Sequence, residues 1–157
     1  MVDKMTVACF SGHRNLPHSC TEPQANLEKT IVELIERGVV FFGSGAALGF
    51  DQMAAEAVLR LKEGYPHIRL VMVLPCPPEQ QSLKWNDEQK KRYYEILEQA
   101  DKVRILSPQY TDKCMHDRNR SMVDCSASHI CYLREQHGGT FYTVRYAEQC
   151  GLKILRL

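Results

Sequence analysis

The sequence has almost no net charge, no long hydrophobic run and no closely paired cysteines. Its formal net charge is +1, so no overall field would attract nucleic acid or an anionic membrane surface. Its longest uncharged apolar stretch, which begins at Val39, is broken by glycines and is far too short to span a membrane. The first apolar run is also too short for a signal peptide. We therefore expect a cytoplasmic protein with no membrane partner, in which any polyanion is bound by a local cluster.

The seven cysteines lack the spacings of disulfide frameworks and zinc sites. Their number is odd, no Cys-x-x-Cys pair occurs, and some lie in apolar runs, as Cys9 and Cys131 do. This pattern is typical of free buried thiols in a reducing compartment. The histidines show no His-Glu-x-x-His spacing either, so we predict no metal site.

Short apolar runs alternate with amphipathic helical patterns along the whole chain. Most of the runs are continuous, which is typical of parallel strands covered on both faces. The pattern predicts an α/β fold, a single doubly wound and mostly parallel Rossmann-like sheet flanked by helices on both faces. With 157 residues and no linker or repeat, we predict one domain over 1–157. The expected strands are 5–10, 39–42, 68–74, 102–106, 129–133 and 153–157, and the expected helices are 22–37, 49–64, 87–99, 117–126 and 141–150.

The turn after the first expected strand contains residues that suit a phosphate. In an open α/β sheet, ligands bind beyond the carboxyl ends of the strands. A small residue and a glycine allow close backbone approach there, and an arginine matches phosphate geometry. An ordinary strand-end turn with a surface arginine would have the same composition. The residues are Ser11, Gly12, His13 and Arg14.

The second such turn is rich in glycine and opens a helix. Glycines before a helix present free N–H groups to an anion, and the helix dipole favours negative charge there. The spacing is neither the dinucleotide fingerprint nor a P-loop. Two acids in the first turns of the helix either complement its dipole or bind ribose hydroxyls. The glycine-rich residues are Gly43, Ser44, Gly45 and Gly49, and the acids are Asp51 and Glu56.

Two later turns add further phosphate-binding chemistry. Cations are disfavoured near a helix start, so arginines there favour an anionic ligand or an acidic neighbour. These residues are Arg118, Asn119 and Arg120. In the last turn we expect Thr140 to cap a helix whose first N–H groups are free. The candidate residues of this turn are Gly138, Gly139, Thr140 and Thr143.

The single tryptophan follows a proline-rich loop and has two candidate roles. Trp85 either fills the edge of the core, which we favour, or stacks on a bound base.

Taken in order, these segments resemble a known family. Ser-Gly-His-Arg, Gly-Ser-Gly-Ala-Ala-Leu-Gly-Phe-Asp-Gln-Met-Ala-Ala-Glu, Arg-Asn-Arg-Ser-Met-Val-Asp and Gly-Gly-Thr-x-x-Thr-Val-x-Tyr-Ala resemble the YpsA-like branch of the SLOG superfamily. That superfamily includes the LOG phosphoribohydrolases and the DNA-processing protein DprA. The resemblance implies a Rossmann-like fold and a nucleotide-type ligand, with NAD or ADP-ribose derivatives expected. It also implies a relationship to bacterial or phage sensors that act in defence signalling.

The likeness to the LOG enzymes is incomplete. Their Met-His-x-Arg motif matches Met115, His116 and Arg118, and the resemblance makes Arg118 the catalytic arginine if this chain is a hydrolase. Their final glutamate, however, is replaced by Thr143. A carboxylate stabilises the oxocarbenium-like transition state of glycoside cleavage, and a threonine cannot. Asp51 or Glu56 would have to replace it.

Three functions follow, in decreasing order of support. The first is a non-catalytic nucleotide or nucleotide-sugar binder that acts as a sensor, carrier or sequestering protein and needs no other cofactor. The second is a nucleotide N-glycosidase of the LOG type, which cleaves nucleoside 5′-monophosphates. The third is a DNA-handling protein, which the near-neutral charge disfavours. The sequence leaves homo-oligomerisation open.

Overall fold

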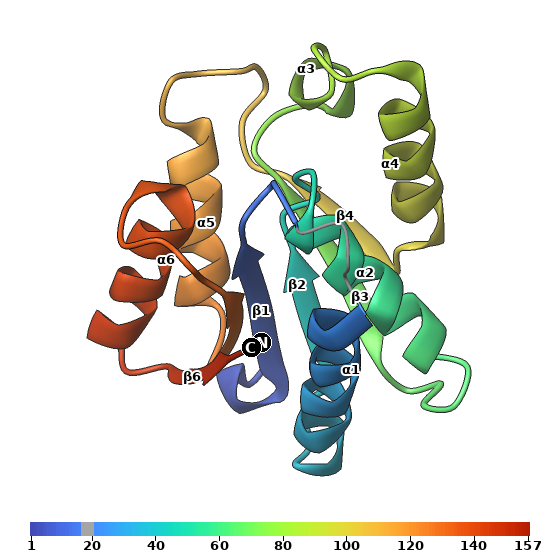
Figure 1. The fold of residues 1–157 in the computed structure, drawn as a ribbon, viewed down its shortest axis with the longest axis vertical. Coiled ribbons are helices and arrows are strands. Elements are labelled where there is room, and N and C mark those ends of the chain that lie inside the picture. The colour runs from blue at the N-terminus through green and yellow to red at the C-terminus, as the bar shows by residue number, and fades with distance from the viewer. Residues whose placement is uncertain (17–20) are drawn as a thin grey trace.

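A single sheet of six parallel strands organises the described residues. The computed structural model describes residues 1–16 and 21–157, and its strands follow the order β4-β3-β2-β1-β5-β6 (Figure 1). This confirms the predicted α/β fold, and all of the described strands are parallel. The strands are β1 (Val7–Gly12), β2 (Phe41–Ser44), β3 (Arg69–Leu74), β4 (Lys102–Ile105), β5 (Ser128–Tyr132) and β6 (Lys153–Arg156).

The helices cover the two faces of the sheet in separate groups. Helices α1, α2 and α4 pack on one face, and α5 and α6 pack against each other on the opposite face (Figure 1). This division follows from right-handed crossovers, because the chain first builds outward from β1 to β4 and then returns to the other side of β1. The helices are α1 (Thr21–Glu36), α2 (Phe50–Leu61), α3 (Pro78–Gln81), α4 (Asp87–Gln99), α5 (Cys114–Asp124) and α6 (Gly138–Gln149), and a 3₁₀ turn covers Lys4–Thr6.

The order in which strands are added to the sheet reverses at β1, since β2 to β4 lie on one side of it and β5 and β6 on the other. This reversal places a topological switch point between β1 and β5. Strand β1 pairs with β2 on one side and with β5 on the other. The helices that follow β1 and β5 leave on opposite faces, so the chain opens a crevice beyond the carboxyl ends of these two strands. That crevice is where ligands bind in open α/β sheets.

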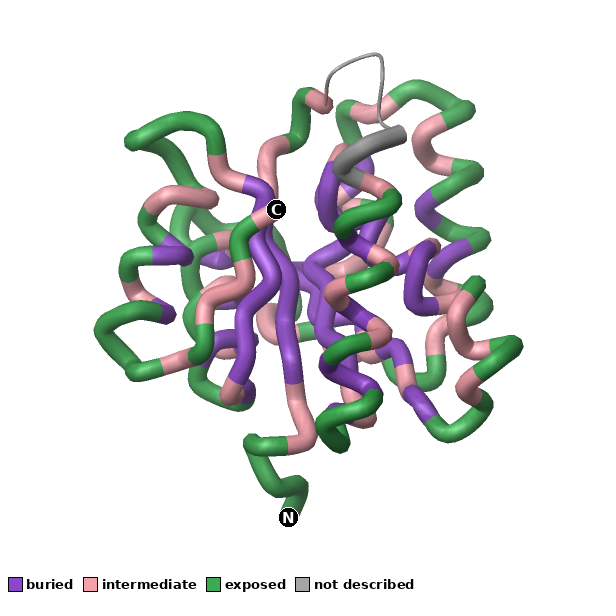
Figure 2. The backbone as a smooth tube through the Cα atoms, turned by 60° about the horizontal axis from the view of Figure 1, so that its bottom comes forward, coloured by how far each residue is buried: buried purple, intermediate pink, exposed green. Residues whose placement is uncertain are grey.

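The core lies mainly on the face covered by α1, α2 and α4. Phe10, Phe42 and Met72 are fully buried there beneath Leu27 and Ile31 of α1, and the buried strands run through the centre of Figure 2. The opposite face has a smaller cluster around Cys9, Val73 and Val123. Helices α5 and α6 therefore cover that face only in part.

Two expected helix starts are wrong, whereas α4 begins at Asp87 as predicted. Asn86 caps α4, because its side chain accepts from Gln89 N (2.8 Å) in a reciprocal capping box. Helix α5 begins at Cys114 rather than at 117, which puts Arg118 in its second turn. Helix α6 begins at Gly138 after His137, so Thr140 lies inside the helix and is not its cap.

The cysteines described by the structure are free. Cys9, Cys76, Cys114 and Cys131 are buried as expected, whereas Cys125 and Cys150 are exposed. Cys20 lies outside the described residues. Within 1–16 and 21–157, none of the helices combines the length and apolar character needed to cross a bilayer.

Candidate functional site

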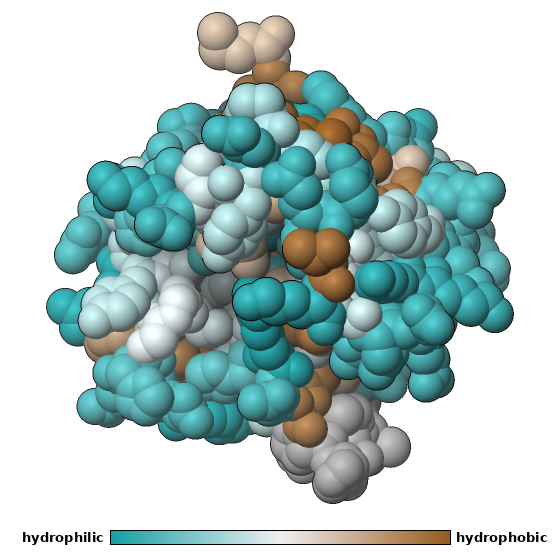
Figure 3. Space-filling view, turned by 90° about the horizontal axis from the view of Figure 1, so that it is seen from above, coloured by the Kyte–Doolittle hydropathy of each residue, from teal (hydrophilic) through white to brown (hydrophobic). Residues whose placement is uncertain are grey.

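A polar cavity of about 370 Å³ lies beyond the carboxyl ends of the paired strands β1 and β5. We call it the strand-end cavity. Figure 3 looks onto this edge of the sheet, where mostly hydrophilic residues surround a central hollow. The predicted site residues that line the cavity are Ser11, Gly12, His13, Arg14, Asp51, Arg118, Asn119, Gly138, Gly139, Thr140 and Thr143, and they are joined by Phe10, Ala47, Met115, Glu135 and His137.

The first two turns are packed closely together and form one wall. A Cβ added at Gly12 would overlap the Phe50 ring at the start of α2. Gly49, whose φ is 84°, brings the backbone against Arg14 in a conformation that other residues rarely adopt. Phe50 N donates to His13 O (3.1 Å), which holds the turns in register. Gly12 therefore makes room for the Phe50 side chain, and Gly49 allows close approach to the Arg14 backbone.

Arg118 is the most buried charge in the cavity wall. Its side chain, on α5, is 3% exposed. Its Nη1 donates to Gly45 O (2.5 Å) and its Nε donates to Asn119 Oδ1 (2.7 Å). Burial lowers the pKa of Arg118 while Asp51 opposes that shift, and a guanidinium stays charged in proteins. The cavity therefore carries a positive charge that two neighbours orient.

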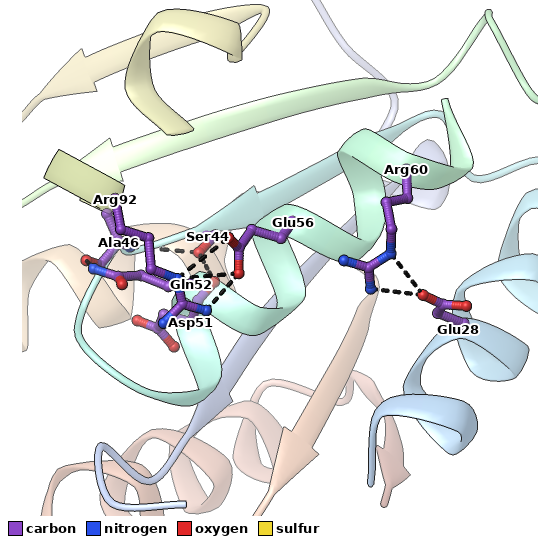
Figure 4. Close-up of polar contacts among 8 residues, drawn as sticks. All are labelled: Glu28, Ser44, Ala46, Asp51, Gln52, Glu56, Arg60 and Arg92. Carbon is purple, nitrogen blue, oxygen red and sulfur yellow. Dashed lines mark hydrogen bonds and ion pairs between the residues drawn. The ribbon is translucent and has the colours of Figure 1, made fainter. Parts of the chain in front are cut away.

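Asp51 supplies a buried acid beside that arginine. Burial raises the pKa of Asp51 to about 6, although the charges of Arg118 and Arg14 favour its ionised form. Ser44 donates its hydroxyl to Asp51 O (2.8 Å) and so ties the start of α2 to the end of β2 (Figure 4). A carboxyl group with such a pKa can give or take a proton near neutral pH.

His129 is a residue of the site that sequence reasoning missed. It is fully buried on β5, and its Nε2 lies 2.5 Å from the Ser11 hydroxyl that lines the cavity. Its Nδ1 lies 3.6 Å from Cys9 Sγ. Burial lowers the pKa of His129 to about 4 and raises that of Cys9 to about 12, so both are neutral near pH 7. In the sequence His129 lies within an apolar run, and only the pairing of β1 with β5 brings it beside Ser11.

The start of α6 forms another part of the cavity wall. His137, in the N-cap position, provides no side-chain cap, and both glycines that follow it are exposed. The first N–H groups of α6 are therefore available to an anion. Thr143 donates its hydroxyl to Gly139 O (2.8 Å) one turn back.

Six predicted site residues lie outside the strand-end cavity. Ser44 and Gly45 lie behind the cavity wall, where they form hydrogen bonds with Asp51 and Arg118. Gly49 contacts the Arg14 backbone, and Gly43 faces a different hollow over the sheet. The Arg120 guanidinium lies 4.2 Å from the centroid of the Tyr146 ring. Glu56 points away toward α4, where it forms an ion pair with Arg92 (Figure 4).

Among 1–16 and 21–157, no group of three or more His, Cys, Asp or Glu side chains is arranged to hold a metal ion. The chemistry of the strand-end cavity thus consists of two arginines, one buried acid, a serine next to a histidine, and a helix start. This set can bind an anion and can exchange a proton with it.

Comparison with known proteins agrees with the predicted resemblance. A family model described as the YspA SLOG family, named YpsA, matches residues 19–153. A UPF0398 protein of Halalkalibacterium halodurans is 43% identical over 76 residues, which are 48% of this chain and 39% of that protein. A UPF0398 protein of Bacillus pumilus is 28% identical over 128 residues, covering 80% of this chain and 68% of the relative.

A solved structure shares the fold. DNA processing protein A from Helicobacter pylori, reported with a single-stranded DNA binding mode, aligns with a TM-score of 0.68 at 19% identity. The alignment covers 98% of this chain and 65% of that one. The matches thus leave about a third or more of these three proteins unaligned, and at this identity the structural likeness concerns the fold alone.

Proposed function

Because the chain belongs to the YspA SLOG family, we propose that its strand-end cavity binds a phosphorylated nucleotide, with NAD or ADP-ribose derivatives among the candidates. One observation carries the proposal. Arg14, Arg118 and the start of α6 converge on one cavity of about 370 Å³ at the switch point of the sheet.

The charges of the cavity favour a phosphate. Arginine guanidinium groups form charge-assisted, bidentate hydrogen bonds with phosphate oxygens. Arg118 is held by Gly45 O and Asn119 Oδ1, so a ligand would meet a preorganised cation. The Asp51 carboxyl group offers hydrogen bonds to sugar hydroxyls in either protonation state. A cavity of this volume is at the lower end of the range for ligand pockets, which favours a small molecule over a nucleic-acid strand.

A thermal-shift screen with NAD, ADP-ribose and the four nucleoside monophosphates tests this proposal. A ligand at one hundred times its dissociation constant adds about 2.7 kcal/mol to the free energy of unfolding. At least one compound is expected to raise the melting temperature. Arg14→Ala should weaken that shift, because this exposed arginine lines the cavity. Arg37→Ala, an exposed arginine that does not line it, is the matched control.

The proposal fails if no nucleotide in the panel stabilises the protein. It also fails if Arg14→Ala and Arg37→Ala bind the stabilising compound equally well. An oligonucleotide that binds more tightly than every mononucleotide would favour a DNA-handling role instead.

A second candidate function is cleavage of a nucleoside monophosphate into base and ribose 5-phosphate. The observation in its favour is the carboxyl group of Asp51, whose pKa burial raises to about 6, in the same cavity as Arg118. Thr143 cannot act as the missing carboxylate. Chromatography of AMP after long incubation distinguishes the two functions. Release of free adenine that Asp51→Asn abolishes would establish the hydrolase, and intact AMP would support a binder.

A further inference from the structure

A second hollow adjoins the strand-end cavity and has a different chemistry. It encloses about 470 Å³ and shares Arg14 and Met115 with the cavity. We call it the aromatic hollow, because Trp85 and Tyr110 line it together with Leu83. A ligand held beside Arg14 therefore has access to an apolar, aromatic surface next to its polar site.

Trp85 is held in place as a wall of the aromatic hollow. It is half-buried and packs against the core. Its ring centroid lies 5.0 Å from that of Tyr93 at an interplanar angle of 53°. Two candidate roles for Trp85 follow from the sequence, filling the edge of the core or stacking on a bound base. Its position is compatible with both, because the ring packs against the core and also lines a hollow.

Hydrogen bonds connect this wall to the strand-end cavity. Tyr93 donates its hydroxyl to Gln81 Oε1 (2.6 Å), and Gln81 Nε2 donates to Gly45 O (3.1 Å). The same carbonyl accepts from Arg118 Nη1. The loop before α5 is tied to this wall as well, since Tyr110 N donates to Gln80 Oε1 (2.6 Å). Hydrogen bonds therefore connect the residues that line the aromatic hollow to those that support the strand-end cavity.

We propose that the aromatic hollow receives the nucleobase of the ligand whose phosphate lies in the strand-end cavity. The inference rests on the function proposed above and goes beyond it by naming the part of the ligand that gives affinity. A flat nitrogen heterocycle stacks on Trp85, and the side chains of Gln80 and Lys84 offer hydrogen bonds to its edge. A sugar phosphate without a base fills only the first space.

The test compares AMP, GMP, CMP and UMP with ribose 5-phosphate by calorimetry. At least one nucleotide should bind about tenfold or more tightly than ribose 5-phosphate, because base stacking on an aromatic side chain supplies that much affinity. Trp85→Ala should remove most of this ratio, and Trp85→Phe should keep part of it. Since Trp85 is the only tryptophan, its fluorescence should change with the nucleotide and not with ribose 5-phosphate.

A surface variant keeps the test decisive if Trp85→Ala does not fold. Tyr110 is 57% exposed and lines the aromatic hollow, so Tyr110→Ala should lower the ratio without disturbing the core. Tyr142→Ala, at a 63% exposed tyrosine that does not line the hollow, should leave it unchanged.

Two failures have different meanings. If ribose 5-phosphate, the four nucleotides, NAD and ADP-ribose all fail to bind, the function proposed above is wrong, and the inference with it. If ribose 5-phosphate binds as tightly as every nucleotide, or the ratio survives in folded Trp85→Ala or Tyr110→Ala, the base-binding inference alone is overturned.

Discussion

Two hollows on this protein differ in size and in chemistry. The strand-end cavity of about 370 Å³ is polar, whereas the sheet-face hollow, over the part of the sheet that α5 and α6 leave open, reaches about 660 Å³. The floor of the sheet-face hollow is formed by side chains such as Val71, Val73 and Phe41, and its charged residues include Lys102 and Asp124. Of the two, size alone would therefore favour the sheet-face hollow, whereas the proposed phosphorylated ligand requires the charges of the strand-end cavity.

The two hollows also differ in the free energy that is needed to bury the side chains around them. Burying Arg118 and Asp51 removes two charges from water, and such an arrangement is unfavourable unless it is compensated. The sheet-face hollow buries no comparable charge; its buried floor consists of groups such as Cys9 and Val73. Local rules are violated most often at functional sites, and among residues 1–16 and 21–157 the two buried charges, Arg118 and Asp51, both line the strand-end cavity.

The largest expected effect comes from Arg118→Ala. Hydrogen bonds to charged groups contribute about 1.5–3 kcal/mol, so nucleotide affinity should fall about 10- to 150-fold. Stability should also fall, because Gly45 O loses a buried donor. Calorimetry and urea unfolding measure both effects. Arg120→Ala, two residues further along α5 and stacked on Tyr146, is the control, and an equal loss of affinity there would contradict the site.

Two nearby glycines give the next largest contrast. A Cβ at Gly45 would overlap the Arg118 guanidinium, whereas a Cβ at Gly43 would make ordinary contacts of 3.8 Å with Ala8 O and 3.9 Å with Cys9. Gly45→Ala should therefore displace Arg118 and weaken nucleotide binding severalfold. Gly43→Ala, which changes the sheet-face hollow, should bind normally. Titration calorimetry of the two folded variants decides whether only one of the two hollows holds the ligand.

A smaller effect is expected from pH. Burial raises the pKa of Asp51 from 3.8 to about 6, so a bound anion faces an increasingly charged carboxylate as pH rises through this value. Nucleotide affinity relative to Asp51→Asn should therefore decline between pH 5 and pH 7. The phosphate titrates in both proteins, so their difference isolates Asp51. A ratio that does not vary with pH would place Asp51 away from the phosphate.

The same shift has a consequence for stability. A raised pKa in the folded state means that the folded protein binds the proton more tightly than the unfolded chain does. The contribution of Asp51 is therefore present at low pH and is lost as pH rises from about 4 to about 6. Urea unfolding of the wild type should show this decline relative to Asp51→Asn.

The smallest effect is expected from Glu56→Gln. Glu56 pairs with Arg92 on the surface, and such exposed pairs contribute about 0.2–1 kcal/mol. Nucleotide affinity should not change, because Glu56 does not line the strand-end cavity. Glu56 belongs to one of the segments that resemble the SLOG family, so a clear loss of affinity in calorimetry would show that the ligand site extends to Glu56.

Much of the fold could be predicted because its strands are continuous apolar runs. The run around Leu70 and Met72 predicts a buried strand, and the structure forms β3 there. The starts of the helices were harder to predict. Caps depend on local hydrogen bonds, and both Asn86 and Asp87 are good capping residues in sequence, while the backbone selects Asn86.

Part of the candidate site could also be predicted from the sequence, and part of it could not. The strand-end turns could be located in advance because ligands gather at the carboxyl ends of parallel strands, and that reasoning reached Ser11, Arg14 and Gly138. It could not separate Gly45 from Gly43 or Arg118 from Arg120. Arg118 and Arg120 lie two apart on a helix and so point to different sides of α5. Gly43 lies within β2, whereas Gly45 follows its last residue, and these boundaries are what the sequence leaves open.

The sequence by itself determined the alternation of strands and helices, the parallel sheet and the turns that carry the unusual residues, since these follow from periodicity and local chemistry. Only the tertiary structure decided that β5 returns beside β1, which brings His129 to Ser11 and sets Asp51 near Arg118. It also decided that Trp85 lines a hollow next to the strand-end cavity. Such contacts join residues far apart in the chain, and packing rather than local sequence determines them.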